Sequence, residues 1–217
     1  MVQIRALTPL GVPRMFPAMN TSHTIARLGD IASIRQGHPF RGAIRAAEDG
    51  SVRVIQLKNV GVNGMDDVHE LMRTHLSNRK APDWVKDGDV VLAARGSRPV
   101  AALLTHPPEN TVCSPHLYVI RVADLARTLP AFIAWQLNQS SAREHLHRQS
   151  AGSRQQSLRK KSVEDLRMRL PPLLHQQRIV TIARAALLER SHCEQLIAAR
   201  TEEVSRYAER LLRGVST

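Results

Sequence analysis

The C-terminal part of the chain constrains the fold most, because it predicts one helix of unusual length. Two prolines stand at 171 and 172, and from residue 173 the chain contains neither proline nor glycine until Gly214. Proline ends a preceding strand and suits the first turn of a helix. At 1.5 Å per residue, a helix over 173–213 spans roughly 60 Å, about twice the diameter of a small domain. One domain of ordinary size cannot cover such a helix along its whole length.

Apolar residues recur along one side of this helix at alternating intervals of three and four, interrupted by Arg190 and Arg200. A long apolar seam with arginine and glutamate on its flanks is typical of a helix that pairs with another helix. The alternative is a helix that lies flat on its own domain. We predict a dimerisation helix whose seam residues are Ile179, Ala183, Ala186, Cys193, Ile197, Val204, Tyr207 and Leu211.

Short β segments dominate the central part of the chain. Residues 52–60 alternate β-branched and polar side chains, and residues 86–97 have the pattern of a strand between two turns. Residues 110–122 form another predicted strand, in which Pro115 indicates a sheet edge or a bulge. Residues 25–36 carry apolar residues at intervals of three, which fits a helical turn or a short twisted strand.

Helical patterns follow. Residues 129–149 predict one helix that is broken near Ser140, and residues 150–157 form a loop rich in glycine, serine and glutamine. Ser162, with Asp165 three residues on, resembles a capped helical turn. The stretch LRMRLP before the two prolines alternates like a short strand.

These patterns predict an α+β protein with three parts. Residues 1–23 contain three prolines without a clear period and are expected to form a flexible N-terminal arm. Residues 24–170 are expected to form a mixed, mostly β domain. Residues 171–217 are expected to form the long, coiled-coil-like C-terminal helix.

The charge balance favours a polyanionic partner. The chain carries 31 Lys and Arg against 19 Asp and Glu, a formal net charge of +12. Nucleic acid and an anionic membrane are the two candidates. Nucleic acid is favoured, because the chain lacks an apolar stretch of the ~18 residues that a membrane span needs. Cys113 and Cys193 are the two cysteines and lie far apart, which fits a reduced, cytoplasmic protein.

Basic side chains gather with Gln, Ser or His in three glycine-containing loops, each of which predicts contact with DNA. Lysine and arginine neutralise phosphates, whereas arginine and glutamine can also read base edges in the major groove. For any single cation the alternative is an ordinary solvated charge. The predicted DNA-binding residues are Arg35, Gln36, His38 and Arg41 in the first loop, Arg95, Ser97 and Arg98 in the second, and Arg154, Gln155, Gln156, Arg159, Lys160 and Lys161 in the third.

Catalytic patterns are missing from the sequence. It has no glycine-rich phosphate or cofactor loop, no Asn-Pro-Pro-aromatic run of an amino-methyltransferase and no carboxylate-lysine pattern of a metal nuclease. His145 and His147 point to different faces of a helix and are not expected to share a metal. Cys113 near His116 could form a nucleophile–base pair, but a cysteine packed in a core is the better explanation. We therefore expect a binding module without catalytic residues, metal ligands or a cofactor.

Four stretches together resemble the specificity subunit of Type I restriction–modification systems. They are LGDIASIRQG, GDVVLAARGS, AGSRQQSLRKKSVEDLRMRLPPLLHQQRIV and the closing helix, and the similarity covers roughly residues 24–213. The resemblance implies that residues 24–170 are a target-recognition domain and that the helix is a spacer. It also implies double-stranded DNA, a DNA adenine methyltransferase subunit and a restriction/translocase subunit as partners, with a role in DNA methylation and phage defence.

The chain departs from that family in length. Usual members carry two recognition domains and two spacers, whereas this chain has one of each. A homodimer through the helix would restore the usual arrangement, and two identical domains about a two-fold axis would read a palindromic split site. The alternatives are a stand-alone dimeric DNA-binding regulator and a metal-dependent nuclease, of which the missing carboxylate cluster disfavours the second.

Overall fold

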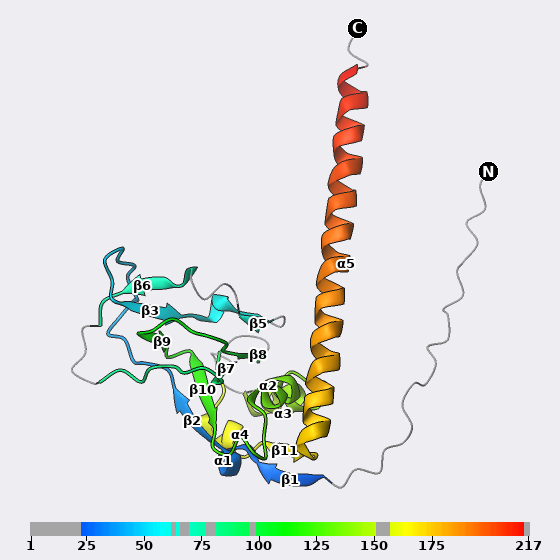
Figure 1. Ribbon diagram of the computed structural model, residues 1–217. Helices are drawn as coiled ribbons and strands as arrows, with labels where there is room; N and C mark the ends of the chain where they lie inside the picture. The colour runs from blue at the N-terminus through cyan, green and yellow to red at the C-terminus, as the bar shows by residue number, and fades with distance from the viewer. Residues whose placement is uncertain are drawn as a thin grey trace.

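The computed structural model describes residues 23–61, 64–65, 70–76, 81–95, 99–150 and 157–214. They form a domain of small sheets and short helices, from which one long helix rises (Figure 1). The predicted α+β class with a long C-terminal helix is confirmed. Within these ranges no helix is both long enough and apolar enough to cross a membrane. The predicted N-terminal arm lies outside the described residues up to position 22.

A four-stranded antiparallel sheet forms the centre of the domain. Its strand order is β2 (Ala32–Gln36), β10 (Leu117–Val122), β7 (Val90–Ala93) and β8 (Ala101–Leu103). The β10 and β7 strands are apolar and β-branched almost throughout and are buried on both faces, as a central strand with covered faces requires.

A second sheet covers one face of the first. Here β3 (Val52–Ile55) pairs antiparallel with β6 (Met72–Thr74) and parallel with β9 (Thr111–Cys113). The predicted strand 52–60 therefore ends early, at Ile55. A 3-10 turn follows, η1 (Leu57–Asn59), and then a small hairpin of β4 (Val60–Gly61) and β5 (Gly64–Met65).

The predicted single strand over 110–122 is wrong, because this stretch forms β9 and β10 in two different sheets. Pro115 is neither at an edge nor in a bulge but in the turn between them. Proline lacks an N–H for a strand ladder, so the chain leaves the second sheet there and enters the central one. The Ser114 N–H still bonds the carbonyl of Ile55, and two residues after Pro115 the N–H of Leu117 bonds back to Ser114.

The start and the end of the domain lie side by side. Strand β1 (Thr24–Arg27) pairs antiparallel with β11 (Arg167–Leu170), which confirms the short strand predicted before the prolines. The apolar residues at intervals of three in 25–36 are divided among β1, a single helical turn α1 (Leu28–Ile31) and β2.

Three short helices cover the other face of the central sheet. The predicted break near Ser140 separates α2 (Pro130–Leu137) from α3 (Ser140–Ser150). The third, α4 (Lys160–Glu164), begins earlier than its predicted cap at Ser162, and that prediction is wrong. The cap position is Arg159, whose carbonyl accepts the N–H of Ser162, so Ser162 lies inside the helix.

Two buried clusters hold these layers together. The larger lies between the central sheet and the helices and includes Leu92, Ile120, Ile133 and Leu146. The second lies between the two sheets and contains Ile55, Val91, Leu104 and Leu117. Side chains alternate between the faces of a strand, so neighbouring residues of β7 and β10 contribute to different clusters.

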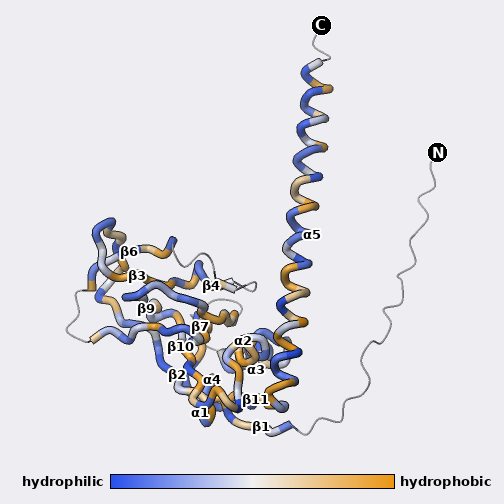
Figure 2. The backbone as a smooth tube through the Cα atoms, viewed as in Figure 1, coloured by the Kyte–Doolittle hydropathy of each residue, from blue (hydrophilic) through white to orange (hydrophobic). Residues whose placement is uncertain are grey.

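Helix α5 (Leu173–Gly214) begins directly after the prolines and leaves the domain after its first few turns. Gln176 is fully buried and anchors the start: its amide nitrogen donates to the carbonyls of Arg127 and Pro171, and its oxygen accepts the N–H of Leu129. From residue 192 onward every residue of the helix is exposed. Figure 2 shows hydrophobic and hydrophilic residues alternating along this exposed part.

Candidate nucleic-acid interface

The first predicted loop begins against the turn 114–116 between β9 and β10. Gln36 Nε2 donates to the Pro115 carbonyl over 2.8 Å, and the Gly37 N–H donates to the carbonyl of Leu117 over 2.9 Å. A Cβ on Gly37 would lie 2.0 Å from a carbonyl oxygen of this turn. The glycine therefore permits a backbone approach that any other residue would prevent.

The second predicted loop begins against the same turn, and the third loop ends beside the second. The N–H of Ala94 donates to the His116 carbonyl over 2.9 Å, and the N–H of Leu158 donates to the Ala94 carbonyl over 2.8 Å. Arg95 and Ser157 form an isolated antiparallel bridge, which joins the two loops side by side.

We call this place the loop junction and define it as residues 36–38, 94–95, 114–116 and 157–158. It brings together three segments that are far apart in the sequence, each of which was predicted independently to contact DNA. Five of the predicted DNA-binding residues lie outside the described residues, in the adjoining parts of these loops: Ser97, Arg98, Arg154, Gln155 and Gln156.

The remaining predicted cations near the loop junction are accessible. Arg95 and Arg159 are exposed. Lys160 and Lys161 form i,i+4 ion pairs with Glu164 and Asp165 over 3.4 and 3.2 Å. Such exposed pairs contribute only about 0–1 kcal/mol, so these lysines can exchange a carboxylate for a phosphate at little cost. Gln36 and, further along the first loop, Arg41 are also exposed.

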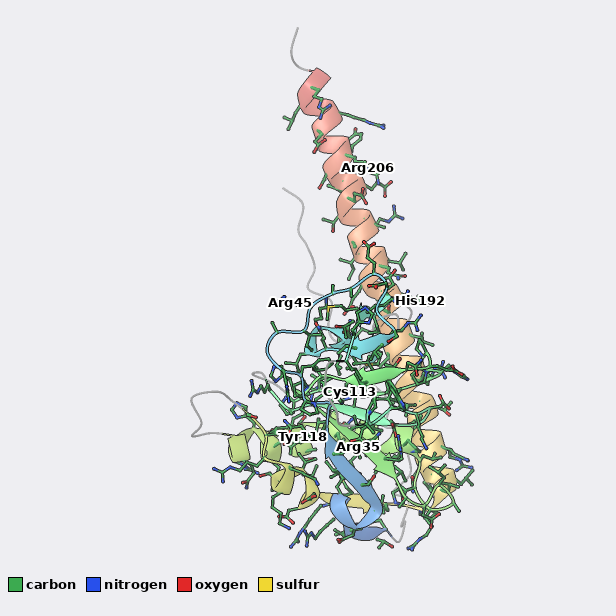
Figure 3. All side chains as sticks on the ribbon, turned by 90° about the vertical axis from the view of Figure 1, so that its left-hand side faces the viewer. Arg35, Arg45, Cys113, Tyr118, His192 and Arg206 are labelled. Atoms are coloured by element: carbon green, nitrogen blue, oxygen red, sulfur yellow. The ribbon has the colours of Figure 1, made fainter. Side chains whose placement is uncertain are left out.

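Arg35 lies on the opposite face of β2 from Gln36, because successive residues of a strand point to opposite sides. Its guanidinium contacts the Asp83 carboxylate over 3.3 Å, the Trp84 carbonyl over 3.0 Å and the Asp89 carboxylate over 3.7 Å (Figure 3). These contacts hold Arg35 between the two sheets and away from the loop junction.

His38 also lies inside the domain. Its side chain is 3% exposed and meets the ring of Phe40 edge-on, with the ring centroids 5.3 Å apart. The burial shows that this ring packs within the first loop. The DNA contacts assigned to His38 and Arg35 from the sequence stay predictions that this packing does not favour.

An ion pair between a buried carboxylate and a partly buried arginine, which the sequence pattern did not reveal, lies beside Arg35. The Asp89 carboxylate is 1% exposed and accepts two hydrogen bonds from Arg121, over 2.7 Å from Nε and 2.6 Å from Nη2. It also accepts the N–H of Lys86 over 2.8 Å. The hydrogen bond with Asp89 raises the pKa of Arg121 above its usual value. Asp89 and Arg121 lie 32 residues apart, so no local motif marks them.

Residues Cys113 and His116 do not form a catalytic pair. Burial raises the pKa of the Cys113 thiol far above its usual range, with a further contribution from the negative charge of Asp89. Cys113 is therefore a residue of the core, as the sequence indicated, and its protonated thiol is a poor nucleophile. Burial, followed by the charge of Arg95, lowers the pKa of His116, which favours the neutral form of its ring.

Removal of the Tyr118 hydroxyl is expected to destabilise the loop junction. This hydroxyl is buried and donates to the Leu158 carbonyl over 2.8 Å, which fixes the end of the third loop on the sheet. In Tyr118→Phe the carbonyl loses its partner, and the free energy of unfolding should fall by about 1–3 kcal/mol. Urea denaturation at pH 7 measures this difference, and an unchanged midpoint would contradict the role given to the hydrogen bond.

The stability difference between the wild type and Tyr118→Phe is expected to depend on pH. Burial raises the pKa of the Tyr118 phenol in the folded state, with a smaller contribution from Glu164. The stability that comes from the neutral phenol is therefore complete below the unfolded pKa of ~10 and is lost as the pH rises through the folded pKa. The stability difference between the wild type and Tyr118→Phe should shrink above pH ~10.

Comparison with known proteins identifies the family. Residues 23–186, more than half of the chain, match the sequence profile of the Type I restriction modification DNA specificity domain. The chain belongs to this specificity family. Its members are the recognition components of restriction–modification systems, so the resemblance drawn from the sequence and the non-enzymatic assignment are both confirmed. A search of curated proteins gave no match.

Solved structures share the fold of this specificity chain. The S subunit of a Type I system from M. genitalium matches with a TM-score of 0.58 and 14% identity, over 91% of this chain and 47% of that one. A structure reported for complex assembly and conformational transition of the type I R-M system matches with a TM-score of 0.54 and 20% identity, over 93% and 45%. The HsdS subunit from Thermoanaerobacter tengcongensis matches with 0.51 and 18%, over 88% and 42%. The chain spans less than half the length of these three proteins.

Proposed function

We propose that this chain is a half-length DNA specificity subunit that directs a partner DNA adenine methyltransferase to a split site. The observation that carries the proposal is the loop junction. There, three basic loops from distant parts of a specificity-family chain meet, two of them at one turn and the third beside the second, with Arg95 and Arg159 exposed. A single surface that combines cations with amide side chains can bind phosphates and read base edges together.

The chemistry of modification belongs to partner chains in this proposal. Among the described residues no three His, Cys, Asp or Glu side chains lie close enough to hold a metal, and the catalytic motifs sought in the sequence are missing. S-adenosylmethionine would bind the methyltransferase, and a restriction/translocase subunit would join the same complex in a cytoplasmic defence system.

Homodimerisation through α5 completes the proposal. The eight seam residues fall within about 120° of arc on the helix at 100° per residue. The last five of them, from Cys193 to Leu211, are exposed and lie beyond the reach of the domain. Beside the start of the seam, α5 and α2 border a groove of about 810 Å³ that includes Ala183, Ala186 and Trp135. A second helix packed along this side would place two recognition domains about a two-fold axis, which suits a palindromic split site.

Loss of a cation at the loop junction is expected to weaken the salt dependence of DNA binding. Arg95→Ala and Lys160→Ala should each reduce the slope of log affinity against log salt by about 0.9, which is the loss of one phosphate contact. Fluorescence anisotropy with labelled duplex DNA measures the slope. Lys86→Ala is the matched control, because Lys86 is an exposed cation before β7, whereas Arg95 follows β7 at its other end.

The partner separates the proposed function from its main alternative. Co-expression with an adenine methyltransferase subunit should give a complex that methylates one split motif, and neither chain alone should do so. A protein that binds one DNA site as a dimer and never associates with a methyltransferase would instead be a stand-alone regulator. In the salt experiment, equal slopes of log affinity against log salt for the wild type, Arg95→Ala and Lys160→Ala would show that the DNA-binding surface lies elsewhere.

A further inference from the structure

Two arginines face each other on the second sheet. Arg53 on β3 and Arg73 on β6 are directly opposite in the antiparallel register. Directly opposite side chains lie on the same face of a sheet with their Cβ atoms about 5 Å apart, and like charges in this arrangement repel each other. A pairing of this kind needs a compensating negative charge.

The described part of the chain supplies that charge only in part, through the exposed carboxylate of Asp49, whose pKa the charge of Arg73 helps to lower after the larger effects of His75 and the backbone. Arg73 Nε donates to the neutral carbonyl of Gly50 over 2.8 Å, and neither arginine forms an ion pair with a described carboxylate. Arg53 is partly buried, and its Nε is shielded from water without a hydrogen-bond partner among the described residues. The Asp49 carboxylate makes its hydrogen bond with His75 over 3.2 Å and attracts Arg73 from the exposed surface, so it does not neutralise the partly buried Arg53. A partly buried guanidinium without a counter-charge is costly unless an anion joins it.

A third arginine is held beside the pair by backbone contacts. The carbonyl of Arg45 accepts the hydroxyl of Thr74 over 2.7 Å, and the N–H of Ala47 donates to the Arg73 carbonyl over 2.9 Å. A Cβ on Gly50 would lie 2.4 Å from the N–H nitrogen of Thr74, so the segment lies directly against β6. Arg45 is exposed at the outer surface of the domain (Figure 3).

We propose that Arg53, Arg73 and Arg45 bind a phosphate of the DNA backbone, at a contact separate from the loop junction. A phosphate offers several acceptor oxygens, and guanidinium groups match them in pairs of parallel hydrogen bonds. DNA is the source to which we commit, because the inference rests on the proposed DNA-binding function and on the net charge of +12. The site extends the DNA footprint from the central sheet to the edge of the second one.

The experiment compares Arg73→Gln and Arg53→Gln with the wild type in full-length protein. Each variant should lower the slope of log DNA affinity against log salt by about 0.9. Arg73 is the exposed member, and its loss removes the repulsion together with the hydrogen bond to Gly50, so the melting temperature of DNA-free Arg73→Gln should stay close to that of the wild type. Arg169→Gln is the control, because Arg169 is an exposed strand arginine opposite the apolar Ile25. Its slope should match the wild type.

Inorganic phosphate provides a second readout without DNA. At equal ionic strength, phosphate should raise the melting temperature of the wild type more than chloride does, and Arg73→Gln should lose this difference. If Arg73→Gln loses the rise in melting temperature with phosphate but keeps the wild-type slope of log DNA affinity against log salt, the site binds free anions and the proposal is overturned. A destabilised Arg73→Gln with an unchanged slope would show that the pair is structural. Wild-type protein that fails to bind DNA would instead refute the proposed function itself.

Discussion

Glutamates at Ile197, Val204 and Leu211 are expected to convert the proposed dimer into monomers while the domain stays folded. These side chains are 66%, 68% and 55% exposed in the single chain and lie on the seam of α5 beyond the domain. Burial of such a side chain contributes about 1.5–3 kcal/mol, so three of them account for much of a helical interface. The substituted carboxylates would also have to be buried against an apolar partner, which adds a desolvation cost.

Sedimentation velocity distinguishes the two states, and thermal melting checks that the domain is intact. Leu188→Glu is the matched control: Leu188 is 55% exposed on the same helix but points about 180° away from Ile197. This variant should remain dimeric. A triple variant that still sediments as a dimer would refute the interface on α5.

A shortened chain tests the same interface by another route. Truncation after Pro172 would also remove Gln176, whose three hydrogen bonds fasten α5 to the domain, so its effect on folding would obscure the result. Truncation after Ser191 keeps this anchor and removes the fully exposed part of the helix. The shortened protein should be a folded monomer. DNA affinity should fall by about 10²–10⁴, because two linked domains no longer bind one site together.

Arg121→Ala is expected to destabilise the domain by about 3–5 kcal/mol. Its removal leaves the Asp89 carboxylate, which is 1% exposed, without its two closest charged hydrogen bonds. The nearest remaining cation is Arg35, 3.7 Å away and also engaged with Asp83. The loss is a large part of the 5–15 kcal/mol that stabilises an ordinary domain. Urea denaturation at pH 7 gives the free energy of unfolding.

A second substitution shows whether the cost comes from the buried charge. Asp89→Asn in the Arg121→Ala background should recover much of the lost stability, because a neutral amide is less costly to bury than an unpaired carboxylate. Equal stability of the single and the double variant would contradict this explanation. Arg35→Ala should lower stability in the same assay and leave the salt dependence of DNA binding unchanged. A changed salt slope for Arg35→Ala would instead support the DNA contact that the sequence predicted for Arg35.

Features that depend on neighbouring residues were predictable from the sequence. The helix expected over 173–213 is observed as Leu173–Gly214, because the prolines before it and the absence of glycine and proline within it act locally. The break near Ser140 and the short strand at 167–170 were predictable for the same reason. The basic composition of the loops was also visible and led to the DNA-binding hypothesis, whereas the spacing of the α5 seam led to the dimerisation hypothesis.

Only the tertiary structure decided which of these residues act together. Gln36 and Arg35 are neighbours, but the pairing of β2 with β10 turns Gln36 toward the loop junction and places Arg35, partly buried, beside Asp89. The division of 110–122 between two sheets depends on partners more than 50 residues away. Arg53 and Arg73 became opposite neighbours through strand register. Side-chain alternation is a local property, whereas the partner strand and the buried face are set by packing across the whole domain.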